Sequence, residues 1–484
     1  MRRVIFYKQL LPHKDKDKDK DAMKKALSKL LRLSHAGDST RDIISYWLPE
    51  LISATILISL PPIIDSWIVS RLGSLTMYGA LGMGRNVLHI LIKFAESIPV
   101  AAIAIIGRHN GAKDYEKCGE SLGDTFWTTF ILGFSQFLLI LLSAKAIYQW
   151  LGVPEHMVAV GAPFLQKKSF GVFLIFTSLG LLGFMRAVKN TRIPMLINIT
   201  GIAVFIFFDY ALVLGKFGFP QMGLTGSAFA TIIQYSMMNI FALTYILTNP
   251  EYKKYFAKMF FAVFNVKRAL HLMNLSWPII IDKSAIGLSY VWLSKMLAPL
   301  GVYAIATYDT VNNLERFAFL PVMASAQVLT FLVSNRLGAH DSEGALINIK
   351  KILFLTCITV IPSLLILSFN ARYFIGIFDP KNTFTDFAAS ILPIISILVI
   401  LDFTQVVLAA ALRGAGDTKT VMYGRAFACG LFFFPVSFMI SKLPIENHSL
   451  KFILIYGSFC LTTGIMGLIF LHRIKSHKWY KNKV

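Results

Sequence analysis

Residues 387–412 read FAASILPIISILVILDFTQVVLAAAL, and this stretch contains a single charged side chain, that of Asp402. A helix needs about 20 mainly apolar residues to cross the hydrocarbon core of a bilayer. Because lipid offers no hydrogen-bond partners to the backbone, such a stretch is expected to be a helix and not a strand. It therefore predicts a membrane-spanning helix that carries one acidic group inside the membrane.

Eleven further stretches have the same character. The chain of 484 residues is 55% hydrophobic and only 15% charged, against roughly a quarter charged in ordinary soluble domains, and its mean hydropathy is +0.61. This composition excludes a water-soluble fold and predicts an all-α integral membrane protein with twelve transmembrane helices. The predicted spans are 43–70, 79–106, 120–143, 162–185, 194–214, 223–247, 272–298, 302–335, 348–370, 387–412, 420–441 and 451–471.

The strong positive charge has a topological explanation. The chain has 48 Lys and Arg against 26 Asp and Glu, a net charge of +22, and a basic balance of this kind is also typical of nucleic-acid binding. When the segments between spans are assigned alternately to two sides, 33 basic residues lie on the side of both termini and ten on the other. The positive-inside rule then orients both termini into the cytoplasm, in a multi-pass cell-membrane protein. No nucleic-acid partner is needed to explain the charge.

The spans divide the chain into five regions. We expect a basic cytoplasmic tail over 1–42, in which 14–21 alternate Lys and Asp, and a short cytoplasmic tail over 472–484. A six-span N-lobe over 43–247 and a six-span C-lobe over 272–471 are joined by a cytoplasmic linker, 248–271.

The two lobes repeat one unit. The motif IGRHNGA at 106–112 corresponds to SNRLGA at 334–339, and 183–192 corresponds to 411–419, at offsets of 227–229 residues. Because six spans is an even number, both copies enter the membrane in the same orientation. They are expected to be related by a pseudo-two-fold axis along the membrane normal, an architecture typical of secondary transporters.

Four motifs resemble those of the multidrug and toxin extrusion (MATE) family within the MOP superfamily. They are IDSWIVSRLG at 64–73, DYALVLG at 209–215, GLTGSAFAT at 223–231 and LRGAGDT at 412–418. The resemblance covers about 43–472. It implies a two-lobed antiporter, not an enzyme, that needs no cofactor and exports drugs or cationic amphiphiles by alternating access in exchange for H⁺ or Na⁺.

Two aspartates of the N-lobe are the main candidates for the coupling site. Asp65 lies six residues before Arg71, and Asp209 lies six before Gly215, so both are about 9 Å from the outer boundary at 1.5 Å per residue. Charged groups inside a membrane are costly and are functional candidates. Two carboxylates at one depth would bind Na⁺ as a metal ligand pair or share a proton. Thr231 adds an oxygen or packs at a small-residue interface.

One departure from the family favours H⁺ over Na⁺. The resemblance implies an Asn one helical turn before the fifth-span aspartate, but this chain has Phe205 there. One oxygen ligand for Na⁺ is therefore missing.

The C-lobe contains a second set of candidates. Asp402 and Gln405 match an acidic position in the tenth span of the NorM-like branch, whereas the seventh-span glutamate of that branch is replaced by Gly287. Asp282 and Lys283 follow Pro278 instead. Either these residues form an ion or substrate site, or Lys283 neutralises Asp402 or Asp282 and the charges are structural.

Pro61 and Pro62 precede Asp65 by about one turn. Proline removes a backbone donor and clashes with the preceding turn, so the pair predicts either a hinge or a static kink.

Two other functions are less well supported by the residues. A flippase for a lipid-linked precursor would favour a cationic cavity, whereas the charges inside the spans are mainly Asp. A membrane-embedded enzyme would need a catalytic motif, and neither a His-Glu-x-x-His motif nor a nucleotide-binding Gly-rich loop is present. We therefore expect a monomeric transporter whose partners are small amphiphilic substrates and membrane lipid.

Overall fold

The computed structural model describes residues 37–258, 264–379 and 381–481, and within them every regular element is helical. The Lys-Asp stretch of the tail lies outside the described residues. The α-helices are α2 Thr40–Ser70, α3 Leu75–Gly111, α4 Tyr115–Trp150, α5 Glu155–Ala187, α6 Arg192–Leu214, α7 Leu224–Thr248, α8 Val266–Leu297, α9 Val302–Ala318, α10 Leu320–Gly338, α11 Ser342–Phe369, α12 Ala371–Phe378, α13 Thr385–Gly414, α14 Thr418–Ala428, α15 Phe434–Lys442 and α16 His448–Lys475. Short elements are η2 Pro250–Lys258, η3 Ala298–Leu300, η4 Cys429–Phe433 and η5 Trp479–Lys481.

The number of membrane spans is only partly as predicted. Among the described residues, ten helices are long and apolar enough to cross a membrane, and the bent pair α9–α10 would be an eleventh. The seventh predicted span corresponds to α8, which is not among them although it has 32 residues. Asp282, Lys283 and neighbouring polar side chains make this helix less apolar than the ten candidate spans. The all-helical membrane fold is confirmed, and the count of twelve stays a prediction.

The predicted span 302–335 is not one straight helix. The structure divides it into α9 and α10, whose axes differ by 48°. Phe319 separates the two, and α10 has a proline, Pro321, in its first turn. Since proline cannot donate the backbone hydrogen bond that would continue the helix, it accounts for the break.

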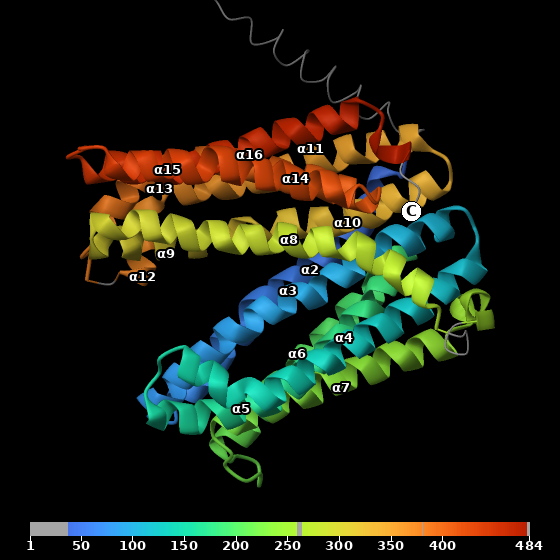
Figure 1. Cartoon of the computed structure of the whole chain (residues 1–484), viewed down its shortest axis with the longest axis horizontal. Helices are drawn as coiled ribbons and strands as arrows, with labels where there is room; N and C mark the ends of the chain where they lie inside the picture. The colour runs from blue at the N-terminus through green and yellow to red at the C-terminus, as the bar shows by residue number, and fades with distance from the viewer. Residues whose placement is uncertain (1–36, 259–263, 380, 482–484) are drawn as a thin grey trace, which may run out of the picture.

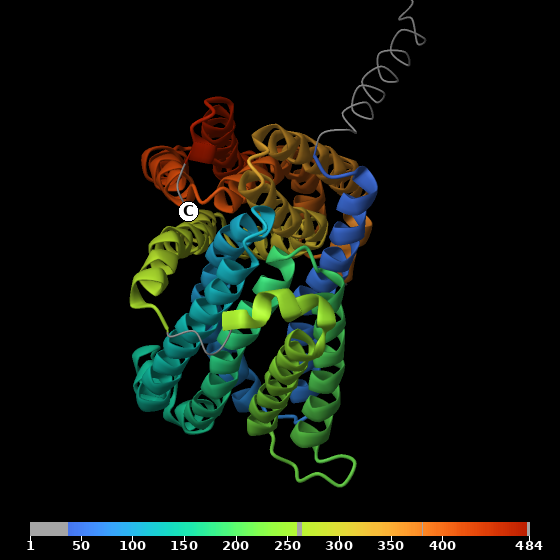
Figure 2. The same cartoon turned by 90° about the vertical axis from the view of Figure 1, so that its right-hand side faces the viewer.

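The helices form two groups that diverge from one end of the molecule. Figure 1 shows α2 to α7 sloping away from α8 to α16, and the two groups meet at the right-hand side. Most contacts between the groups involve α3 and α10, with α2 and α8 also taking part. Figure 2, which faces this end, shows η2 lying across the ends of the first group, where it packs against α4 and α7.

Glycines let the backbones of α3 and α10 touch where the groups meet. A β-carbon added at Gly111 would lie 1.9 Å from the carbonyl oxygen of Asn335, and one at Gly338 would lie 2.0 Å from that of Arg108. Gly107 faces the Ser334 hydroxyl in the same way, at 2.0 Å. These residues belong to the two copies of the repeated motif. No larger side chain fits at these glycines without separating the helices.

Polar side chains complete this joint. The Asn335 amide donates to the carbonyl oxygen of Ala187 at 2.8 Å, and the Asn110 amide donates to Asn335 at 2.7 Å. Hydrogen bonds made in a buried setting hold the two groups in a fixed register.

Candidate functional site

Asp65 on α2 lies at the centre of a polar cluster in the first group of helices. Its residue is 4% exposed. The Ser227 hydroxyl of α7 donates to one carboxylate oxygen at 2.9 Å, and the Lys168 ammonium of α5 lies 3.5 Å from the other. Arg85 of α3 is 3.7 Å from that second oxygen. Four helices therefore surround one carboxylate, and two cations neutralise it.

Asp209 on α6 is the second carboxylate of the cluster, and its environment differs. It is fully buried, and within the described part of the chain neither of its carboxylate oxygens has a hydrogen-bond partner. Asp65 and Lys168 are the charged groups that act on it, and the Ser227 hydroxyl also lies close enough to interact with it. Because an isolated buried carboxylate is costly, this arrangement favours a proton or a cation bound at Asp209.

Local backbone geometry brings α6 and α7 together at this cluster. Gly226 of α7 is so close to α6 that a β-carbon there would lie 2.7 Å from the Leu212 carbonyl carbon. The next residue, Ser227, thereby reaches Asp65. Gly215 ends α6 in the left-handed conformation, with φ of 68°, which glycine adopts without strain.

The other N-lobe candidates are not in direct contact with the carboxylates. The Thr231 hydroxyl donates to the Ser227 carbonyl at 3.0 Å, and its methyl group lies 2.9 Å from where a β-carbon of Gly171 would be. This geometry is that of helix packing. Pro61 and Pro62 lie within α2, which continues through both, so their role as a hinge stays a prediction.

Lys168 and Ser227 were not identified from the sequence. Lys168 is one of the ten basic residues assigned to the side opposite the termini although it falls within the predicted span 162–185, and α5, which begins at Glu155, places it well inside the helix. Ser227 is part of the GLTGSAFAT motif, yet a serine in a small-residue helix carries no signal of its own. Only the packing of α2, α5 and α7 shows that both contact Asp65.

In the second group, Asp282 of α8 forms a buried ion cluster. It is 1% exposed, and the guanidinium groups of Arg413 on α13 and Arg425 on α14 both donate to its carboxylate. Three helices are therefore joined by one carboxylate with two cations. Removing one charged partner from such a buried cluster is strongly destabilising, because the remaining charges stay buried without compensation.

The expectation that Lys283 neutralises Asp282 or Asp402 is wrong. Lys283 instead contacts Glu96 of α3, with 3.0 Å between the ammonium nitrogen and a carboxylate oxygen. Adjacent residues on a helix point about 100° apart. Asp282 therefore faces α13 and α14, while Lys283 faces α3 and links the two groups of helices.

Asp402 and Gln405 lie together, and the charge of Asp402 acts on the buried Glu315. The Gln405 amide donates to Asp402 at 3.0 Å. Glu315 of α9 accepts a hydrogen bond from Tyr456 at 2.6 Å, and among the described residues its second oxygen has no partner. Asp402 acts electrostatically on Glu315. Glu315 thus adds a second buried carboxylate, from α9, that interacts with Asp402.

Asp38, in the segment before α2, connects both groups at the joint. Its carboxylate accepts from Lys189 at 2.8 Å, from Arg336 at 3.0 Å and from Asn348 at 2.7 Å. Burial alone raises the pKa of this carboxyl, but the hydrogen bonds and the positive charges of Arg336 and Lys189 outweigh burial and lower the pKa to about 2. Asp38 falls within the predicted basic cytoplasmic tail, 1–42, and nothing in the sequence indicates that it is buried.

This lowered pKa predicts a pH-dependent contribution to stability. A shift from 3.8 to about 2 corresponds to about 2 kcal/mol. Because the folded-state pKa is depressed, the contribution is present above the unfolded-state pKa and is lost as the pH falls from about 4 toward 2. We expect Asp38→Asn to lower the free energy of unfolding at pH 7 and to converge with the wild type near pH 2. Denaturant unfolding in detergent measures both, and the exposed Asp42→Asn is the control. An equal loss at all pH values would contradict the assignment.

Comparison with known proteins identifies the family. The MatE family model matches residues 51–211 and again 278–439, so the two matches begin 227 residues apart. The chain belongs to the MatE family. The double match has the spacing of the repeat found in the motifs, and MatE membership confirms the resemblance and identifies a membrane transporter, not an enzyme.

Relatives named as multidrug resistance proteins are similar in sequence to this chain over most of its length. The probable multidrug resistance protein NorM of Mannheimia succiniciproducens is 23% identical, over 89% of this chain and 95% of the relative. The multidrug resistance protein NorM of Photobacterium profundum is also 23% identical, over 83% and 87% of the respective chains.

Solved structures show the same fold. A mutant of the Vibrio cholerae MATE transporter VcmN superposes with a TM-score of 0.81 at 17% identity, over 92% of this chain and 98% of that one. A MOP superfamily transporter from Pyrococcus furiosus superposes with a TM-score of 0.81 at 16% identity, over 93% and 98%. The chain therefore has the MATE transporter fold.

Proposed function

We propose that this chain is a multidrug antiporter that exports small amphiphilic or cationic molecules in exchange for protons. The relatives are named multidrug resistance proteins, which supports the substrate class. The observation that carries the coupling is the contrast between two neighbouring carboxylates: Asp65 is neutralised by Lys168, whereas Asp209 is buried without a partner among the described residues.

The cluster suits a proton better than Na⁺. A sodium ion needs several oxygen ligands, but the Lys168 ammonium is beside Asp65 and the Ser227 proton is donated to Asp65. Phe205 occupies the position of a further oxygen ligand. A proton needs one carboxylate oxygen, and Asp209 has both oxygens free of hydrogen bonds within the described chain.

The antiport cycle follows because a proton and a cationic substrate compete for the cluster of Asp65 and Asp209. Protonation of Asp209 from outside removes the charge of the carboxylate that has no ion-pair partner among the described residues. Loss of that proton toward the cytoplasm leaves an ionised carboxylate with which a cationic substrate can pair before the substrate is exported. Exchange arises because the proton and the cationic substrate neutralise the same site and exclude each other.

We further propose that Asp402, Gln405 and Glu315 form a second substrate or proton site, whereas Asp282 and Lys283 are structural. The unpartnered oxygen of Glu315 supports the first assignment. The ion pairs to Arg413, Arg425 and Glu96 support the second.

The membrane arrangement is part of the proposal. We propose that α8 also crosses the membrane, which brings the number of spans to twelve. The spans then form two six-helix lobes related by a pseudo-two-fold axis. Both termini lie in the cytoplasm, and the protein is a monomer in the cell membrane. The reciprocal contacts of Gly111 and Gly338 support the axis, because each contact maps onto the other at the 227-residue offset. In this orientation the closed joint is cytoplasmic, and the structure represents an outward-facing state.

Transport by purified protein in liposomes tests the proposal. Ethidium is present at the same concentration on both sides of the membrane, and either a pH gradient or a Na⁺ gradient is imposed alone. We expect the pH gradient alone to drive ethidium movement and the Na⁺ gradient to leave it at the rate of protein-free liposomes. Flux driven only by Na⁺ would replace the coupling ion, and flux with neither gradient would reject antiport.

A further inference from the structure

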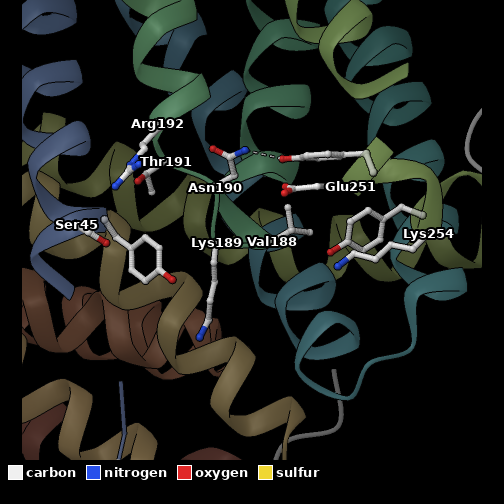
Figure 3. A pocket seen from close by; sticks show the side chains of 11 residues that line it. Ser45, Val188, Lys189, Asn190, Thr191, Arg192, Glu251 and Lys254 are labelled. Atoms are coloured by element: carbon white, nitrogen blue, oxygen red, sulfur yellow. Dashed lines mark hydrogen bonds between the residues drawn. The ribbon is translucent and has the colours of Figure 1, made fainter. Parts of the chain in front are cut away.

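A cavity outside the proposed coupling site lies at the joint end of the first group of helices. It has a volume of about 280 Å³. Figure 3 shows its lining, which comes from three segments: the start of α2, the loop between α5 and α6, and η2. The lining residues include Ser45, Lys189, Asn190, Thr191, Arg192 and Lys254.

The cavity contains the N-terminus of α6 and an unsatisfied hydroxyl. Thr191 is the residue that precedes α6, and its side chain makes no capping hydrogen bond. It is 1% exposed, and in the described chain its hydroxyl has no partner. The first N–H groups of a helix and the helix dipole attract anions. In α6 the Arg192 N–H can serve, whereas the Ile193 N–H donates to Asn190 and residue 194 is a proline. A buried hydroxyl beside them that lacks a partner is a ready donor to an anionic oxygen.

The charged groups of the lining are mainly cationic. Among the described residues, Arg192 has no carboxylate partner, and the Lys254 ammonium lies over the rings of Tyr115 and Tyr255 at 4.6 and 5.0 Å. Lys189 also lines the cavity but is paired with Asp38. Glu251 is the opposing carboxylate. Arg192 and Lys254 therefore leave a positive surplus beside Thr191.

Neutral donors add to this surplus. The Asn190 amide donates to the Tyr252 hydroxyl at 3.0 Å, a bond drawn in Figure 3, so Tyr252 keeps its own proton for a ligand. The Asn190 carbonyl oxygen accepts from the Ile193 N–H at 3.2 Å. Asn190 thus fixes the loop without placing a negative charge in it.

The repeat provides an internal comparison. The residues that correspond to Asn190, Thr191 and Arg192 at the 227-residue offset are Asp417, Thr418 and Lys419. Thr418 is likewise buried without a hydrogen-bond partner in the described chain. Asp417, however, is a carboxylate that pairs with Arg473 at 2.7 Å. The second half therefore has a negative charge where the first half has a neutral amide.

We propose that the cavity formed by Thr191, Arg192, Lys254 and the N-terminus of α6 binds a phosphate group. Both the headgroup of an anionic lipid and free phosphate present the same chemistry: tetrahedral anionic oxygens that accept from a guanidinium, a hydroxyl and a backbone N–H group. The site is separate from the carboxylates of the proposed coupling mechanism, and it binds its ligand whether or not that mechanism holds.

Two binding measurements on the full chain in dodecyl maltoside test the site and distinguish the two sources. Native mass spectrometry measures bound phosphatidylglycerol, and equilibrium dialysis measures radiolabelled inorganic phosphate. The variants are Arg192→Gln, which removes a cation, and Asn190→Asp, which copies the residue of the second half. Asn190→Asp keeps the acceptor for Ile193, and the Tyr252 hydroxyl then donates to the new carboxylate, so the loop is expected to fold. Lys419→Gln is the matched control for loss of one charge.

We expect Arg192→Gln to weaken binding by about tenfold, the effect of losing one charge-assisted hydrogen bond. We expect Asn190→Asp to weaken binding by about tenfold or more, because it places a negative charge beside the phosphate. Lys419→Gln is expected to bind like the wild type. If only the lipid binds in this residue-dependent way, its headgroup is the ligand; if phosphate also binds, free phosphate is a ligand. The proposed site would be rejected if neither phosphatidylglycerol nor phosphate bound, if all variants bound equally, or if Lys419→Gln weakened binding as much as the other two variants.

Discussion

Asp209→Asn is expected to reduce proton-driven substrate flux to the rate of protein-free liposomes. The asparagine has nearly the shape of a protonated aspartate but cannot release a proton, so the cluster is held in one charge state. Substrate binding should be weak at both pH values, because the cluster lacks the carboxylate that a cationic substrate pairs with, and its dependence on pH should disappear. Flux assays in liposomes and a fluorescence titration of ethidium at pH 6 and pH 8 measure the two effects separately.

Asp65→Asn is expected to stop flux for a different reason. It leaves the cations Lys168 and Arg85 without their carboxylate, so ethidium binding should weaken at every pH because a cationic substrate is repelled. The control is Asp386→Asn, which removes an exposed carboxylate paired only with Arg372 in the described chain. Wild-type pH-driven flux in Asp209→Asn would reject Asp209 as the coupling group.

Asp282→Asn is expected to be the most destabilising single change proposed for the second group of helices. It leaves the guanidinium groups of Arg413 and Arg425 buried without a counter-charge. Removing one partner of a buried ion cluster costs about 3–5 kcal/mol. The apparent Tm of the protein in detergent should therefore fall by roughly 5 °C or more.

Two comparisons distinguish a structural role of Asp282 from a role in transport. Asp386→Asn should leave the Tm unchanged, since exposed ion pairs contribute little. At a temperature where Asp282→Asn is still folded, its flux should keep the pH dependence of the wild type. A variant with normal Tm and altered pH dependence would show that Asp282 belongs to the coupling machinery.

Composition predicts most of the fold because the apolar interior of the bilayer restricts the structures that a hydrophobic stretch can adopt. An apolar stretch of sufficient length has few alternatives to a membrane-spanning helix, so the helices α2 to α7 lie close to their predicted ranges. Composition predicts a membrane span least well where contacts with other helices neutralise the polar side chains of that span. The charge of Asp282 is paired within the bundle, and α8 consequently tolerates a less apolar sequence than a span exposed to lipid.

The candidate site could be predicted only as far as residue type and depth allow. Asp65 was identified because a carboxylate inside a span is unusual, and the structure shows it within a charged cluster. Its partners Lys168 and Ser227 come from two other helices, and helix rotation, which decides such contacts, has no signature in a single sequence. The same limit explains Lys283, whose direction around α8 determines that it contacts Glu96.

The contacts of Gly111 and Gly338 have the form of an interface between two identical subunits. Gly111 meets Asn335 while Gly338 meets Arg108, and Arg108 and Asn335 are themselves 227 residues apart. In a two-fold dimer, residue i contacts j and j contacts i, and every substitution appears in both subunits. Because the two halves here share one chain, each can change alone. The chain can therefore keep the symmetric contacts of Gly111 and Gly338 while the two halves differ elsewhere, with a neutral Asn190 in the first half and a charged Asp417 in the second.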